Sequence, residues 1–242
     1  SSSSSSSKSS ALLPSSLQHC QTIITRTLLM LRRACKYLHA RKQLNEVIIA
    51  KGVVHDVMGC LSSFLSPPLS TKLMMLAKDH DDGNAATKAL AAEREASKEH
   101  ISAILARCAH DEEGRTDIST YESSSNTATN TGGISGVEWV VKLLTDSKDT
   151  EQLSKNDALI ANTSTLISVM SVDKSTWPLF GKCIPVLIQA LRRDDYVRSN
   201  EFQVMQKNAA VALAKIAKYP ANIKKIRDLH GMELLYRAVA RG

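Results

Sequence analysis

Apolar residues recur at spacings of three and four along most of this chain, which is the pattern of amphipathic helices. The pattern predicts four long helices, at residues 17–39, 85–109, 154–171 and 200–218. The first of these has a well-defined apolar face, formed by Ile24, Leu28, Leu31, Cys35 and Leu38. Glycine and proline fall between the periodic segments, so the hydrophobic pattern predicts an all-α protein.

The order of the predicted elements is clearest at residues 206–239. The long helix here has one apolar stripe, formed by Phe202, Met205, Ala209, Leu213 and Ile216. Pro220 stands where a second helix begins, because the first turn of a helix has no partner for the N–H that proline lacks. Gly231 is suited to the left-handed turn that ends a helix, and Met232 to Val239 then form a third.

This layout of helix, proline-started helix, glycine and third helix resembles the armadillo repeat. The resemblance implies a right-handed α-solenoid of about four helical repeats, partly degenerate, and a binding scaffold rather than an enzyme. Further glycines that precede amphipathic runs fit repeats of about 40 residues, namely Gly52, Gly136 and Gly181. Armadillo proteins act in adhesion, transport, ciliary and assembly roles, so the family resemblance leaves the specific role open.

We divide the chain into four segments on this basis. Residues 1–16 are rich in serine and are expected to form a disordered tail. Residues 17–110 form the first two repeats and residues 133–242 the last two. Between them, the Ser/Thr/Asn-rich stretch 111–132 is expected to be an inserted mobile loop, because so few of its residues can bury apolar surface.

Positive charge is concentrated at the start of the chain. The net charge of +7 equals the seven Lys and Arg residues that precede the first acidic residue, Glu46. The rest of the chain is balanced, so a basic surface at the N-terminal helix is expected to attract acidic partners.

The sequence shows no arrangement typical of catalysis or of cofactor binding. It has no glycine-rich phosphate loop, no HExxH and no GxSxG. Five scattered cysteines without a CxxC favour buried thiols in a reducing compartment, and we expect a cytoplasmic protein. Ciliary, nuclear and organellar locations stay open. We expect no enzyme activity, no cofactor and no metal, and the chain has no apolar run of the ~20 residues that a membrane span needs.

The candidate site is therefore a partner-binding surface. We expect a protein partner with an acidic surface or segment, in a hetero-complex. The residues proposed to bind it are the basic ones of the first and last long helices and the apolar ones of the last helix: Arg26, Arg33, Lys36, Lys207, Lys215, Lys218, Leu234, Leu235, Tyr236 and Val239. In nuclear-import adaptors of the armadillo family an asparagine grips a basic peptide, and Lys215 stands at the corresponding position here. A lysine there would repel a basic signal, so the resemblance does not imply an import receptor.

Three questions stay open at the level of sequence. The basic N-terminal helix could instead bind nucleic acid or an anionic membrane, although few aromatic residues accompany it. Residues 1–45, rich in serine and free of acidic residues, also resemble an organelle transit peptide. The apolar helix at residues 232–239 could be covered by another subunit or by further repeats.

Overall fold

The computed structural model describes residues 12–40, 42–49, 52–65, 83–122, 134–145, 156–193 and 199–240. In these residues the chain is helical apart from short turns and one isolated β-bridge, between Glu122 and Ser135. The all-α prediction is confirmed.

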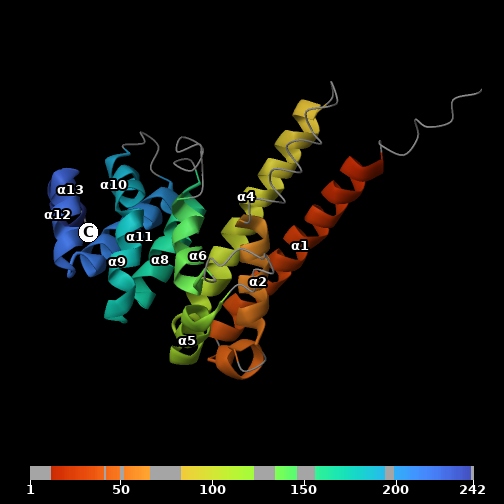
Figure 1. The fold of residues 1–242 in the computed structure, drawn as a ribbon, viewed down its shortest axis with the longest axis horizontal. Helices are drawn as coiled ribbons and strands as arrows, with labels where there is room; N and C mark the ends of the chain where they lie inside the picture. The colour runs from red at the N-terminus through yellow and green to blue at the C-terminus, as the bar shows by residue number, and fades with distance from the viewer. Residues whose placement is uncertain are drawn as a thin grey trace, which may run out of the picture.

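A long helix, a short helical segment and a medium-length helix follow one another four times (Figure 1). The first group comprises α1 (Leu12–Ala40), the π-helix η1 (Asn45–Ile49) and α2 (Val53–Leu65), and the second comprises α4 (Gly83–Cys108), α5 (Glu112–Thr120) and α6 (Gly136–Thr145). The third comprises α8 (Asp157–Met170), three short segments, η2 (Lys174–Thr176), α9 (Trp177–Phe180) and η3 (Gly181–Cys183), and α10 (Ile184–Arg192). The fourth comprises α11 (Asn200–Ile216), α12 (Pro220–Asp228) and α13 (Gly231–Ala240).

The groups lie side by side in chain order along the long axis of the molecule, with α1 at one end and α13 at the other (Figure 1). The long helices pack consecutively, α1 on α4, α4 on α8 and α8 on α11. One hydrophobic core runs through all four groups, from Leu28 of α1 to Ile226 of α12. Burial of this shared core is the main force that holds the stack together.

The observed helices correct the boundaries of two predicted segments. Leu12 to Ser16 belong to α1, so the predicted tail 1–16 is too long, and residues 1–11 lie outside the described part. The loop predicted at residues 111–132 is wrong at its start, because Glu112–Thr120 form α5. Residues 123–132 lie outside the described part.

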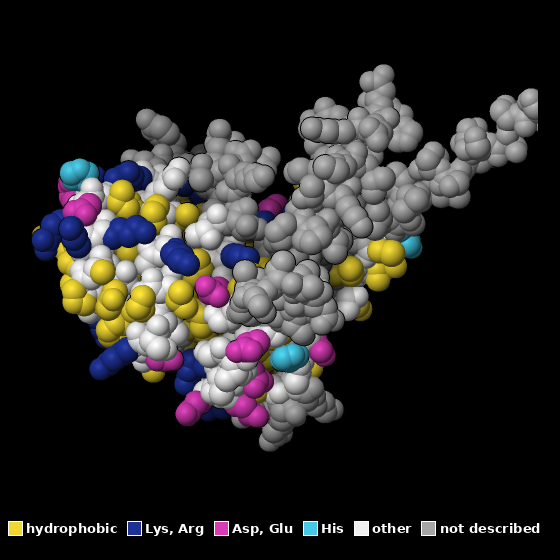
Figure 2. All heavy atoms as spheres, in the orientation of Figure 1, with side chains coloured by type: hydrophobic (Ala, Val, Ile, Leu, Met, Phe, Trp, Pro, Cys, Tyr) yellow, Lys and Arg dark blue, Asp and Glu magenta, His cyan; other side chains and the backbone are white. Residues whose placement is uncertain are grey.

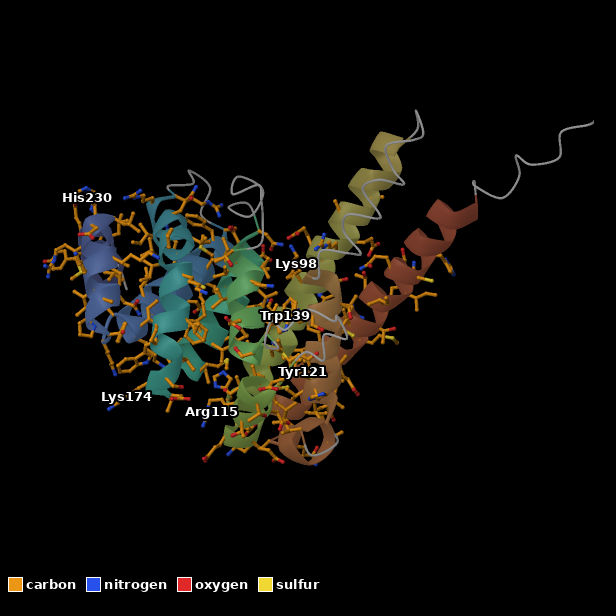
Figure 3. The ribbon with its side chains drawn as sticks, in the orientation of Figure 1. Lys98, Arg115, Tyr121, Trp139, Lys174 and His230 are labelled. Atoms are coloured by element: carbon orange, nitrogen blue, oxygen red, sulfur yellow. The ribbon has the colours of Figure 1, made fainter. Side chains whose placement is uncertain are left out.

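Two anchors explain why α5 forms in a polar stretch. Ile118 is completely buried, and the Tyr121 hydroxyl lies 3.2 Å from Ser62 Oγ of α2. Tyr121 is labelled in the middle of the molecule in Figure 3, and the Tyr121 carbonyl accepts a hydrogen bond from Gly136 N at 2.8 Å. The acidic residues of the first turn add favourable charge at the helix N-terminus.

Gly231 separates α12 from α13 as predicted, but for a different reason. The left-handed residue is His230, with φ of 53°, whereas Gly231 has no positive φ. A Cβ on Gly231 would lie 2.7 Å from Ile188 Cδ1 and 2.9 Å from Ile226 Cγ2. Close packing against α10 and α12, rather than the turn, therefore requires glycine here.

Candidate partner-binding surfaces

Helix α11 begins at a well-formed N-cap. Ser199 Oγ accepts a hydrogen bond from Phe202 N at 3.1 Å, which satisfies one of the free N–H groups of the first turn. Phe202 is buried in the core, as are the other predicted stripe residues, Met205, Ala209, Leu213 and Ile216. The cap and the stripe together fix which residues of α11 face outward.

The outward face of α11 alternates apolar and basic side chains. Val204 and Val211 are exposed although they are apolar, and Lys207 of the same helix is exposed beside them. Lys218, also exposed, lies in the turn that follows the helix end at Ile216. At 100° per residue the three positions within α11 fall within about 60° of one another on the helix surface. We call these four residues the α11 strip. Lys207 and Lys218 were both predicted as partner-binding residues.

Polar bonds hold α11 on α8 next to this strip. Asn208 Nδ2 donates to Thr165 Oγ1 at 3.0 Å and to the Ala161 carbonyl at 3.3 Å. Lys215 Nζ donates to the Ser168 carbonyl at 3.0 Å. Lys215, predicted to contact a partner, is thus engaged within the chain and fixes the position of α11.

The neighbouring helix α8 is partly exposed at Ala158, Asn162, Thr165 and Val169. Their spacing of four, three and four places them on one helix face. Asn162 Nδ2 is buried there without a hydrogen-bond partner in the described residues. The polar residues Asn162 and Thr165 carry no charge, so the charge of this region comes from the α11 strip.

The C-terminal helices are held by long-range bonds to α9 and η3. Asn222 Nδ2 donates to the Trp177 carbonyl at 2.9 Å and to the Ile216 carbonyl at 3.0 Å. Lys225 Nζ donates to the Gly181 carbonyl at 2.9 Å. These bonds fix the position of α12, which begins at Pro220 as predicted.

Helix α13 exposes a smaller apolar surface than the sequence indicates. Leu234 and Leu235 are half-buried against the protein's own core, whereas Met232 and Tyr236 are exposed, Tyr236 by 76%. Val239 lies in α13, but its side chain is outside the described part. Met232 is a further candidate contact that was not predicted. Its spacing of four from Tyr236 could have indicated that the two side chains share one face of α13.

The basic residues of α1 divide into two groups, the predicted residues and Arg32. Arg26, Arg33 and Lys36 are exposed. Arg32, in contrast, faces α4, where it pairs with Glu99 at 2.6 Å and donates from Nη1 to His100 Nδ1 at 3.1 Å. The first group is available to a partner, and the Arg32 contacts hold α1 in place.

Charge is distributed unevenly over the surface. On the face shown in Figure 2, Lys and Arg side chains lie among hydrophobic ones over the C-terminal end, where α12 and α13 are. Acidic side chains gather over α5, whose first turn carries Glu112 and Glu113. A partner with acidic groups would therefore be attracted to the C-terminal end rather than to the middle.

Two buried thiols, of Cys35 and Cys108, and one half-buried imidazole, of His100, lie at the contact between α1 and α4. A hydrogen bond from the Cys108 thiol, together with the nearby Arg107 guanidinium, lowers the pKa of Cys35, although burial opposes this. The bond and burial raise the pKa of Cys108. Burial and then Arg32 lower the pKa of His100, while Glu99 and Glu93 oppose the shift.

Searches for metal sites, for membrane-spanning helices and for similar proteins give no further indication of function. Within the described ranges, no group of three or more His, Cys, Asp or Glu residues is placed to hold a metal ion. None of the described helices is both long and apolar enough to cross a membrane. Comparison with protein-family models, with curated protein sequences and with solved structures gave no match for this chain.

Proposed function

We propose that this chain is a non-enzymatic interaction module. In this proposal the four helix groups form a right-handed α-solenoid of armadillo-like repeats, and the α11 strip binds an acidic segment of a partner protein. Met232 and Tyr236 of α13 supply a second, apolar contact. The single observation that carries the proposal is the exposure of two valines close to two lysines along a firmly held helix.

The repeated order of helices supports the solenoid part of the proposal. Long helices that pack consecutively are what a stack of helical repeats requires. Two bonds between α8 and α11, Asn208 to Ala161 and Lys215 to Ser168, both join positions 47 residues apart. A constant offset of this kind is expected when equivalent positions of consecutive repeats face each other.

The chemistry of the α11 strip supports an acidic partner with apolar side chains. Removing Val204 and Val211 from water would favour binding by about 25 cal/mol for each Å² buried. Lys207 and Lys218 would pair with carboxylates at the rim, where each exposed ion pair contributes roughly 0.2–1 kcal/mol. Lysines at such positions contribute more to the rate of association and to partner choice than to affinity.

Charge reversal on the α11 strip tests this proposal. The probe is a fluorescent peptide of alternating Glu and Leu, and binding is measured by fluorescence anisotropy at about 50 and 200 mM salt. We expect the natural protein to bind it, and the Lys207→Glu/Lys218→Glu variant to bind at least tenfold more weakly. The matched control is Lys174→Glu, because Lys174 is also exposed but lies on η2 (Figure 3).

The three proteins give distinct outcomes. Loss of binding in the α11 variant alone, with binding weakened by salt, supports the proposal. Equal binding by all three proteins, or no binding by the natural protein, contradicts it. Circular dichroism of each variant establishes that the helices are retained.

A further inference from the structure

Helix α1 carries a second apolar stripe, separate from the face that packs on α4. Ile23, Met30 and Tyr37 are 52%, 71% and 54% exposed. Their spacing of seven residues places them on one side of the helix. The buried face of α1 lies on the other side and includes Leu28 and Cys35. Three large apolar side chains exposed in one row are more than scattered surface residues, and such rows mark interaction sites.

The position of α1 in the stack leaves this stripe exposed to more than half. α4 packs between α1 and α8, and α8 packs between α4 and α11. α1 lies at the end of the stack, where the described residues cover one of its sides (Figure 1). α4 and α8, in contrast, each pack on two other long helices.

Arginines complete the pattern of the stripe. Arg26 and Arg33 are exposed between the apolar residues, so Ile23, Arg26, Met30, Arg33 and Tyr37 follow one another at spacings of three and four. This is the spacing of the a and d positions by which one helix packs on another. Here the a positions are apolar and the d positions are arginine.

We propose that the outer side of α1 binds an amphipathic, acidic helix of a partner protein. Apolar residues of that helix would pack on Ile23, Met30 and Tyr37. Its Glu or Asp residues would pair with Arg26 and Arg33, whose planar guanidinium groups match carboxylates in bidentate geometry. The inference rests on the proposed function only in that both describe a binding module. It concerns another helix and can fail or succeed independently of the α11 strip.

Charge selects this occupant over a second copy of the chain. α1 contains no Asp or Glu, so two α1 helices packed together would place arginine against arginine. Lys36, exposed beside the stripe, adds to the repulsion. An acidic helix satisfies both the charge and the apolar row. A nucleic-acid backbone would satisfy the charge but would leave Ile23, Met30 and Tyr37 uncovered.

Designed peptides test the proposal directly. One probe is a monomeric peptide of about three heptads with leucine on its apolar side and glutamate beside it, and the other has lysine in place of every glutamate. Binding to the full chain is measured by fluorescence anisotropy. We expect the glutamate peptide to bind at least tenfold more tightly than the lysine peptide. In the Arg26→Glu/Arg33→Glu variant this preference is expected to reverse.

A matched pair of variants locates the contact. Met30→Asp is expected to weaken binding of the glutamate peptide at least tenfold. Val172→Asp is expected to leave it unchanged, because Val172 is equally exposed, at 70%, but lies beyond the end of α8. The α11 variant Lys207→Glu/Lys218→Glu is also expected to bind this peptide normally, which separates the test from that of the α11 strip.

Four results would overturn the proposal. These are equal binding of both peptides, binding that survives Met30→Asp, dimerisation through α1 detected by sedimentation, and absence of peptide binding. If the chain instead binds phosphatidylserine vesicles or duplex DNA and loses that binding in the arginine variant, α1 recognises lipid or nucleic acid and not a partner helix.

Discussion

Two asparagines on neighbouring helices differ in how their amides are satisfied. Asn208 Nδ2 donates two hydrogen bonds to α8, whereas Asn162 Nδ2 is buried without a partner in the described residues. A buried polar group without a partner costs about 1–3 kcal/mol, while a typical intramolecular hydrogen bond contributes about 1 kcal/mol. Equal substitutions at the two positions should therefore have opposite effects on stability.

We predict that Asn162→Leu raises the free energy of unfolding by about 1 kcal/mol and that Asn208→Leu lowers it by about 1–2 kcal/mol. Urea unfolding followed by circular dichroism measures both. A loss of stability in Asn162→Leu as large as that in Asn208→Leu would show that the Asn162 amide does have a partner in solution.

Glycines at two positions allow a similar comparison. A Cβ at Gly231 would meet two buried isoleucines, whereas at Gly59, inside α2, it would meet Tyr121 Oη at an ordinary 3.9 Å. Gly231→Ala is expected to lower the free energy of unfolding by about 1–3 kcal/mol through overpacking. Gly59→Ala is expected to raise it by about 0.5–1 kcal/mol, because alanine favours the helix. Thermal unfolding of both variants checks this, and equal effects would contradict the packing argument.

At the scale of elements, the contact between α1 and α4 depends on a neutral histidine. His100 Nδ1 accepts a hydrogen bond from Arg32, which it can do only when that nitrogen carries no proton. Burial and Arg32 lower the pKa of His100 in the folded chain, with Glu99 and Glu93 in partial opposition. As pH falls through the ordinary histidine value of about 6.5, the unfolded chain binds the proton first, so the folded state loses stability.

We therefore predict that the free energy of unfolding falls between pH 7.5 and pH 5.5, and that it falls less in His100→Gln. Glutamine keeps an acceptor for Arg32 but cannot be protonated. Urea unfolding at the two pH values measures the difference, and His19→Gln, on an exposed part of α1, controls for the loss of a histidine. An unchanged pH dependence in His100→Gln would exclude a role for this imidazole.

The helices that the sequence predicts well are those with many periodic apolar residues. All four long helices are found within a few residues of their predicted ends, except for the start of α1, and Leu28 and Cys35 lie on the predicted buried face. α5 could not be predicted, because only Ile118 and Tyr121 anchor it and two residues give no period. The outer stripe of α1 was missed for another reason, namely that its spacing of seven is hidden by a stronger buried stripe.

The candidate surfaces were predictable only in part. Exposure of Lys207, Lys218, Arg26 and Arg33 follows from their place opposite the apolar stripes. The engagement of Lys215 with Ser168 could not be predicted, because it depends on which carbonyl of α8 lies next to α11. Tertiary packing, not periodicity, decides which of several outward lysines remain available to a partner.

At the scale of the whole molecule, exposed basic groups lie toward both ends of the stack. Arg26 and Arg33 are exposed on α1, Lys207 on α11 and Lys218 just after it, and Glu112 and Glu113 on α5 between them. Both proposed binding surfaces therefore favour the same chemistry, acidic partner segments with apolar side chains, at opposite ends of one stack.

The stacked order also determines where the molecule opens most readily. α8 is covered by α4 and α11, and α6 and α10 pack on it as well, whereas α1 and α13 lie at the ends. In a stack whose adjacent helices stabilise one another, the free energy of local opening is highest for a helix that has neighbours on both sides. We predict that hydrogen exchange is slowest in α8 and in the C-terminal half of α4, and fastest in α1 and α13.

The effect of a substitution on hydrogen exchange should then reach different helices when it is made in the middle of the stack and when it is made near an end. Leu166 of α8 and Ile226 of α12 are both completely buried, and truncating either to alanine is expected to cost about 2–5 kcal/mol. Leu166→Ala should speed exchange in α4 and α11, because each packs on α8, whereas Ile226→Ala should speed it in α12 and α13 and leave α4 unchanged. Exchange measured by mass spectrometry on both variants separates these patterns. If Ile226→Ala accelerated exchange equally from α1 to α13, the chain would open as a single cooperative unit, and the nearest-neighbour account of its stability would be wrong.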